Sequence, residues 1–168
     1  MPKSFNPAPL GLMGFGMTTI LLNLLNAGIL YTDALGVILP LGIFYGGLAQ
    51  IIAGLLEAKQ GNSFGATAFT SYGLFWLTFV AINFLPTLGL SEAASTTSIA
   101  VYLIMWGVFT SLMSVATFKA NVALQVVFIS LAILFFILAI TDLTDISLIK
   151  TLGGYEGIFV DSALCTLP

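Results

Sequence analysis

Side chains that could bind a polar solute recur within the apolar stretches of this sequence. Thr19, Asn23 and Asn26 follow Phe15 at intervals of three or four residues, so a helix would place them on one face. Later apolar stretches add further hydroxyl, amide and phenol groups, namely Tyr45, Gln50, Thr70, Ser71 and Tyr72. Such groups can hydrogen-bond a small solute without carrying charge. They predict a narrow polar path between helices, or else polar contacts that only hold the helices together.

Residues that commonly carry out catalysis or bind metals are scarce. The 168 residues include no histidine and one cysteine, Cys165, so histidine chemistry, an intrachain disulfide and a cysteine-rich metal site are excluded. Glu57 is the only acid at the edge of the first five apolar stretches. Because Lys59 lies close to it, we expect Glu57 to be a solvated residue at a helix end rather than a proton carrier. We therefore expect no enzyme, no cofactor and no bound metal.

The overall composition places most of the surface in lipid. Of all residues, 59% are hydrophobic and 7% are charged, and the mean hydropathy is +1.12. A soluble domain carries about 25% charged residues, so a water-soluble monomer is excluded and the expected solvent is a lipid bilayer. The net charge of −3 and the lack of a basic patch also exclude a nucleic-acid partner.

Five apolar stretches are long enough to cross a bilayer as helices, which requires about 20 residues. They cover residues 9–30, 34–56, 66–85, 97–118 and 122–140. The connections are short, so neighbouring helices are expected to be antiparallel. A sixth stretch, residues 152–167, would rise roughly 24 Å as a helix, less than the hydrocarbon core of roughly 30 Å. The sequence thus predicts one transmembrane domain over residues 1–168, an all-α integral membrane bundle of six helices with a short or truncated sixth.

The distribution of charges predicts an orientation in the membrane. Lysine-rich connections lie on the cytoplasmic side by the positive-inside rule. A cytoplasmic N-terminus places Lys3, Lys59 and Lys119 inside, with Lys150 as the one exception. Four acids then fall outside, namely Asp33, Glu92, Asp142 and Asp145. We expect a multi-pass protein of the cell (plasma) membrane with its N-terminus in the cytoplasm.

The first apolar stretch opens with a proline-rich motif, Asn6-Pro7-Ala8-Pro9-Leu10-Gly11-Leu12. Asn6 can cap a helix, and Pro9 can begin one at low cost because the first N–H groups of a helix have no partner within it. Free N–H groups at this helix start would point at the cytoplasmic mouth and could attract carboxylates. The motif therefore predicts a vestibule with Asn6 at its rim.

This motif and several others together resemble the succinate–acetate permease family, also called acetate uptake transporters. The motif continues as Met13-Gly14-Phe15-Gly16-Met17-Thr18-Thr19. The further matching segments are residues 42–50 (GIFYGGLAQ), residues 69–73 (FTSYG), and Tyr102 with Trp106-Gly107. The likeness extends in order from Asn6 to about Gly157, which is nearly the whole chain, and several linked motifs are more specific than any one of them.

The resemblance implies a fold, an assembly and a substrate. It implies six helices around a pore in each protomer, a homohexamer, and proton-linked passage of acetate, with succinate and other small carboxylates as further candidates. In the family a narrow ring consists of an aromatic pair and a leucine of the fifth helix, which match Phe15, Tyr72 and Leu131 here. At this ring we expect the protonated acid to pass.

Two other functions are compatible with the residues alone. An uncharged polar path between the helices would equally suit a neutral small-solute channel for urea, ammonia or water. It would also suit a membrane scaffold in which the polar groups only join helices. Flux of labelled acetate, urea and water into liposomes would separate the three.

Overall fold

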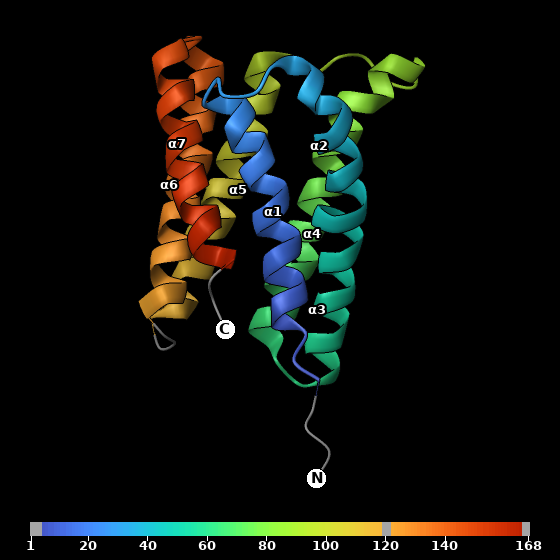
Figure 1. The fold of residues 1–168 in the computed structure, drawn as a ribbon, viewed down its shortest axis with the longest axis vertical. Coiled ribbons are helices and arrows are strands. Elements are labelled where there is room, and N and C mark those ends of the chain that lie inside the picture. The colour runs from blue at the N-terminus through green and yellow to red at the C-terminus, as the bar shows by residue number, and fades with distance from the viewer. Residues whose placement is uncertain (1–4, 119–121, 166–168) are drawn as a thin grey trace.

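The computed structural model describes residues 5–118 and 122–165, which form antiparallel helical rods (Figure 1). Two of the lysines that predict the orientation, Lys3 and Lys119, lie outside the described residues, as do the last two residues of the expected sixth stretch, 166 and 167. No strand occurs among the described residues. The fold is therefore all-helical, as the composition predicts.

Six rods make up the described bundle. The first is α1 (Ala8–Asn26), and the second runs without a break through η1 (Thr32–Ala34), α2 (Leu35–Leu41), the π-helix η2 (Gly42–Ala49) and α3 (Gln50–Lys59). The others are α4 (Ser63–Phe84) with the 3-10 turn η3 (Leu85–Leu88), α5 (Thr96–Thr117), α6 (Val122–Thr144) and α7 (Ser147–Cys165). By length and composition, the first five are suited to cross a membrane.

The sixth rod, α7, begins at Ser147, five residues before the expected start at residue 152. Only two residues separate α6 from α7, and Asp145 makes this turn with a positive φ of 53°. The Asp145 N–H donates to the Thr141 carbonyl oxygen at 2.8 Å, which closes the end of α6. Lys150, whose charge suggests a loop, lies in the first turn of α7 instead.

The central position of α1 organises the bundle. Figure 1 shows α1 between two groups, with α2, α3 and α4 on one side and α5, α6 and α7 on the other. The second rod packs on α1 and α4, α5 packs on α6, and α7 packs on both α6 and α1. Aromatic side chains of α4, α5 and α6 fill the space between the groups, around Phe75 and Trp106. Residues on different sides of α1 can therefore contact either group of helices.

Glycines let the second rod approach α4 closely. A Cβ on Gly46 would lie 2.8 Å from the Trp76 ring, and a Cβ on Gly42 would lie 2.9 Å from it. This pair has the small-xxx-small spacing that allows helix backbones to approach in membranes. Trp76 is fully buried as a result.

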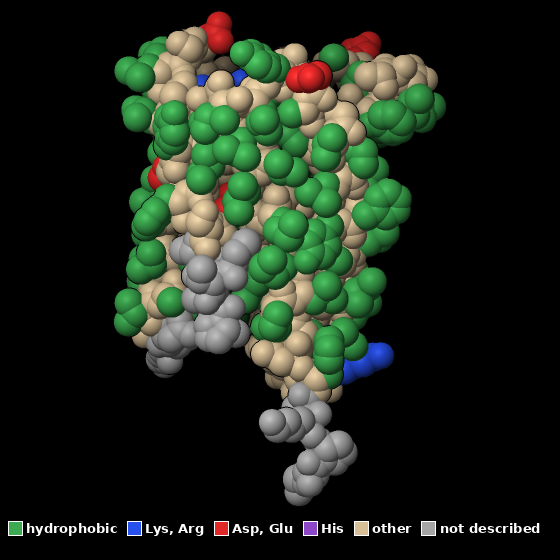
Figure 2. All heavy atoms as spheres, in the orientation of Figure 1, with side chains coloured by type: hydrophobic (Ala, Val, Ile, Leu, Met, Phe, Trp, Pro, Cys, Tyr) green, Lys and Arg blue, Asp and Glu red, His purple; other side chains and the backbone are tan. Residues whose placement is uncertain are grey.

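The outside of the bundle is suited to lipid. Large apolar side chains such as Phe44, Leu112 and Phe159 are about two-thirds exposed, at 67%, 68% and 67%. Figure 2 shows hydrophobic side chains along the flank of the bundle, whereas acidic side chains gather at the end opposite the N-terminus. This distribution is that of a multi-pass membrane protein.

The close approach of α4 to the second rod makes a stability prediction. We expect Gly73→Ala to lower the free energy of unfolding by about 1–3 kcal/mol, because its new methyl would lie 2.8 Å from both the Gly47 carbonyl oxygen and Ile51 Cγ1. Thermal denaturation in detergent measures this. Gly36→Ala in α2 is the matched control, since its Cβ would meet nothing within 4 Å. Equal melting temperatures for the two variants would contradict the close contact.

Candidate functional site

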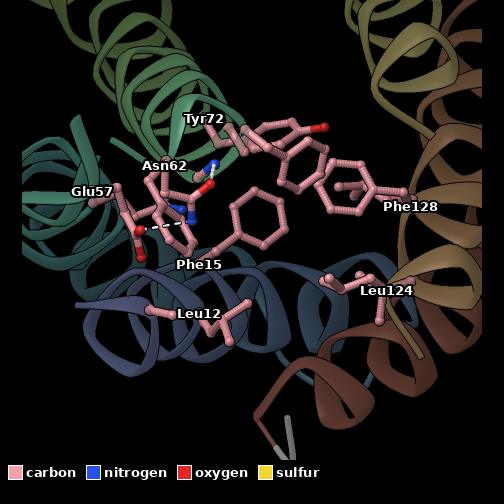
Figure 3. Close-up of a pocket in the computed structure, with 15 residues that line it drawn as sticks. Leu12, Phe15, Glu57, Asn62, Tyr72, Leu124 and Phe128 are labelled. Atoms are coloured by element: carbon pink, nitrogen blue, oxygen red, sulfur yellow. Dashed lines mark hydrogen bonds between the residues drawn. The ribbon is translucent and has the colours of Figure 1, made fainter. Parts of the chain in front are cut away.

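A cavity of about 150 Å³ lies at the end of the bundle where α1, α4 and α6 begin. The first turns of α1 contribute Ala8 and Leu12 to its wall, the end of α3 contributes Glu57, and the starts of α4 and α6 contribute Phe64 and Leu124. A single water needs about 10–15 Å³ of such volume, so the cavity has room for several waters or a small acid. Figure 3 shows Leu12, Phe15, Tyr72, Leu124 and Phe128 around this space.

The wall of the cavity includes all three residues of the expected ring. Phe15, Tyr72 and Leu131 come from α1, α4 and α6, and they are 4%, 4% and 3% exposed. The Phe15 and Tyr72 rings meet edge to face with centroids 5.2 Å apart. The structure therefore brings these three residues together on one cavity, and their role as a constriction stays a prediction.

The hydroxyl of Tyr72 is committed to α5. It donates to the Thr110 hydroxyl oxygen at 3.0 Å, and Thr110 in turn donates to the Trp106 carbonyl oxygen at 2.8 Å. Further aromatic rings, those of Trp106, Phe109 and Phe128, surround the Tyr72 ring. Tyr72 is thus fixed in position, and its one polar hydrogen is already used within the protein.

The polar part of the cavity wall includes an unpaired acceptor and a buried carboxyl group. Gln50 is 1% exposed, and its Oε1 has no hydrogen-bond partner among the described residues. Glu57 lines the same cavity and is 3% exposed. None of the described lining residues is a lysine. This wall suits a solute that brings its own donor.

The expectation that Glu57 is a solvated helix-end residue is wrong. Gly61, with a φ of +77°, turns the chain back after α3, and Asn62 then lies over the end of that helix. Asn62 Nδ2 donates to Glu57 Oε2 at 2.7 Å, as Figure 3 shows, and Asn62 Oδ1 accepts from the Gly65 N–H at 3.1 Å. Asn62 is therefore a site residue that sequence reasoning missed, although asparagine directly before a helix is a known capping signal.

The other predicted polar residues lie outside the lining of this cavity. Thr19 donates to the Phe15 carbonyl oxygen at 2.7 Å, whereas Asn23 Nδ2 donates to Asp161 Oδ2 at 2.8 Å. Asn26 lies one turn further along α1, with Nδ2 donating to Asn23 Oδ1 at 3.4 Å. Asn23 therefore faces α7, and none of the three residues lines the cavity.

The remaining four predicted residues lie elsewhere in the structure. Asn6 Oδ1 accepts from the Ala8 N–H at 3.1 Å at the start of α1. The Tyr45 carbonyl oxygen lies against Gly14, where a Cβ would be 2.7 Å from it, and the Thr70 backbone N would be 2.8 Å from a Cβ on Gly54. Ser71 borders a shallow hollow beside Trp106. Their role on a solute path also stays a prediction.

Similarity to known proteins identifies the chain. Residues 1–166 match the model of the GPR1/FUN34/yaaH family. The chain belongs to this family. It is 57% identical over 156 residues to the succinate-acetate/proton symporter SatP of Escherichia coli K12, an alignment that covers 93% of this chain and 82% of the relative. The predicted resemblance to succinate–acetate permeases is thereby confirmed.

Other similar proteins match over nearly the whole chain. A solved structure of the bacterial acetate channel SatP superposes with a TM-score of 0.93 at 55% identity, covering 97% of this chain and 89% of that one. The ammonia transport outward protein 2 of Saccharomyces cerevisiae is 38% identical over 164 residues, covering 94% of this chain and 58% of the yeast protein. These relatives are named as transport proteins.

The buried carboxyl at the cavity makes a second stability prediction. We expect Asn62→Ala to lower the free energy of unfolding by about 2–4 kcal/mol, because it removes a helix cap and also the partner of Glu57. Ser95→Ala is the matched control, since Ser95 caps α5 through the Ser98 N–H but contacts no buried acid. Its expected cost is about 1 kcal/mol. Chemical denaturation in detergent reports both, and equal costs would show that the contact with Glu57 contributes nothing.

Proposed function

We propose that this chain passes acetate across the membrane through the cavity and the ring of Phe15, Tyr72 and Leu131, with succinate and other small carboxylates as further substrates. The observation that carries this proposal is the ring itself, buried at a small cavity whose wall is mostly apolar. It is supported by the 57% identity to a protein named as a succinate-acetate/proton symporter and by the fold shared with an acetate channel.

The chemistry of the cavity favours the protonated acid at the ring. The methyl group of acetic acid suits the apolar wall, and its O–H can donate to Gln50 Oε1 or to the Glu57 carboxylate. Protonating a carboxyl of ordinary acidity at pH 7 costs about 3.7 kcal/mol. Moving a bare anion past an apolar ring without a cation costs more, since burial of an unpaired carboxylate is penalised by several kcal/mol or more. A proton therefore accompanies each acetate.

A neutral small solute is the second candidate. The yeast relative at 38% identity is named for ammonia transport, and ammonia would pass an uncharged ring without protonation. Urea and water belong to the same class. Gln50 and Glu57 offer acceptors to N–H donors as well as to the O–H of an acid.

We further propose that the end of the bundle with the cavity faces the cytoplasm of the cell membrane and that the chain forms a homohexamer. The positive-inside rule rests on lysines. Exposed Lys59 lies at this end, and in the sequence Lys3 and Lys119 precede α1 and α6, which begin at this end, whereas Lys150 at the other end is the one exception. The hexamer follows from the family resemblance alone.

Flux into liposomes tests the proposed function and its proton linkage together. We expect labelled acetate to enter faster than labelled urea, ammonia or water relative to protein-free liposomes. At fixed total acetate, the flux should rise as the pH falls from 7 to 5, without net current in planar bilayers, because the passing species is neutral. Preferential ammonia flux would favour the second candidate, and a steady acetate current at neutral pH would show that the anion passes.

Trimming the ring should change which acids pass. We expect Phe15→Ala and Leu131→Ala to admit larger acids such as lactate, because the barrier at the ring is steric, at a cost of about 2–5 kcal/mol in stability. Uptake of labelled lactate relative to acetate measures this. Phe44→Ala is the matched control, since Phe44 is 67% exposed on the lipid-facing surface. If the ring variants keep the parent's selectivity, the three residues only pack the bundle.

A further inference from the structure

A carboxyl that is not part of the cavity wall lies at the contact of α1 with α7. Asp161 is 0% exposed, and its Oδ2 accepts from Asn23 Nδ2 at 2.8 Å. Its Oδ1 is buried without a hydrogen-bond partner among the described residues. Gly157 faces the Asn23 side chain so closely that a Cβ there would clash with it, which holds Asn23 against α7.

Among the described residues, no cation compensates this carboxyl. Helix α1 contains no titratable side chain, and the only one in α6 is Asp142, which is paired electrostatically with Lys150. Among the described side chains of α7, Glu156 is the group whose charge reaches Asp161, and it is also an acid. A buried carboxylate without a cation is among the costliest groups in a membrane helix, and such residues commonly mark proton paths.

The neighbours of Asp161 complement a proton on this carboxyl. The hydrogen of the Thr19 hydroxyl is donated to the Phe15 carbonyl oxygen at 2.7 Å, so the Thr19 oxygen can only accept. Thr19 lies beside the carboxyl, and Asn23 donates to Oδ2. A proton on the carboxyl would therefore have the Thr19 oxygen as a neighbouring acceptor, whereas a bare carboxylate leaves Oδ1 without a donor.

The carboxyl is also placed beyond the ring. Asn23 follows Phe15 by eight residues on the same face of α1, which is about 12 Å along the helix axis. The cavity lies in the other direction, towards Ala8 and Leu12. The ring of Phe15, Tyr72 and Leu131 thus separates the cavity at one end of the bundle from Asp161 towards the other.

We propose that Asp161, held by Asn23 and Thr19, is a proton-binding site that protonates acetate on its way to the ring from the end opposite the cavity. The O–H bond of the Asp161 carboxyl breaks and an O–H bond forms on acetate, which leaves an Asp161 carboxylate and neutral acetic acid. The carboxylate then regains a proton from the solution at that end, towards which the half-buried Glu156 lies. This inference rests on the proposed passage of acetate as the neutral acid.

Such a site matters most where the acid is scarce in solution. Between pH 7 and pH 5 the protonated fraction of dissolved acetate rises by roughly two orders of magnitude. A resident proton donor should therefore raise the flux at pH 7 and contribute little at pH 5, where neutral acid already arrives from solution. A merely structural contact between α1 and α7 would affect the flux at both pH values alike.

Asp161→Asn tests the inference. Asparagine has the shape of the protonated acid and can accept from Asn23 and donate to Thr19, but it carries no transferable proton. Exchange of labelled acetate at equal pH on both sides, corrected for protein-free liposomes, should fall about tenfold or more at pH 7 and match the parent at pH 5. Asp33→Asn, which removes an exposed acid at the same end, should follow the parent at both pH values.

Infrared spectroscopy gives a second readout that requires no variant. With ¹³C-labelled aspartate, the parent protein at neutral pH should show the isotope-shifted band of a protonated carboxyl. Absence of this band, or an Asp161→Asn profile that coincides with the parent at both pH values, would overturn the role of Asp161 alone. A parent protein that passes no acetate at either pH would instead overturn the proposed function.

Discussion

No water reaches the hydrocarbon core of a bilayer, so each polar hydrogen within these helices needs an acceptor inside the protein. Most hydroxyls meet this requirement on their own helix. Thr18, Ser111 and Thr141 each donate to the carbonyl oxygen four residues earlier, at 2.7, 2.7 and 3.0 Å. Most hydroxyl hydrogens of the apolar stretches are thereby paired within their own helix. The path between the helices is therefore more apolar than a count of hydroxyls would suggest.

Some polar side chains instead bond a residue of another helix. Tyr72 reaches α5 through Thr110, Asn62 reaches the end of α3 through Glu57, and Asn23 reaches α7 through Asp161. The Tyr72–Thr110 contact joins α4 to α5, and the Asn23–Asp161 contact joins α1 to α7. The same contacts define the cavity and the buried carboxyl beyond the ring.

The sequence predicts much of the fold because lipid imposes simple rules. Long apolar stretches become helices, and short connections make them antiparallel, so the helices follow the expected stretches closely from Ala8 to Thr144. The family motifs also point to Phe15, Tyr72 and Leu131, which meet on one cavity. The partners of Glu57 and Asp161 could not be found this way, because helical periodicity gives the face of a residue but not the helix that covers it. The expected start of the last helix is too late because the charge of Lys150 favours a connection, whereas Lys150 lies within α7 after the short turn at Asp145.

The π-helix of the second rod has a consequence for how the family can vary. Hydrogen bonds that run to the fifth residue rather than the fourth wind the chain more slowly, so Gly42–Ala49 shifts the angular phase of everything that follows it. Gln50 and Glu57 face the cavity at the phase set by this segment. A deletion elsewhere in the rod would turn both side chains by about 100°, whereas removal of one residue between positions 42 and 49 would let this wider turn close to an ordinary α-helix and leave both nearly in place. The π-helix is therefore where relatives of this chain can differ by one residue without changing which side chains face the cavity.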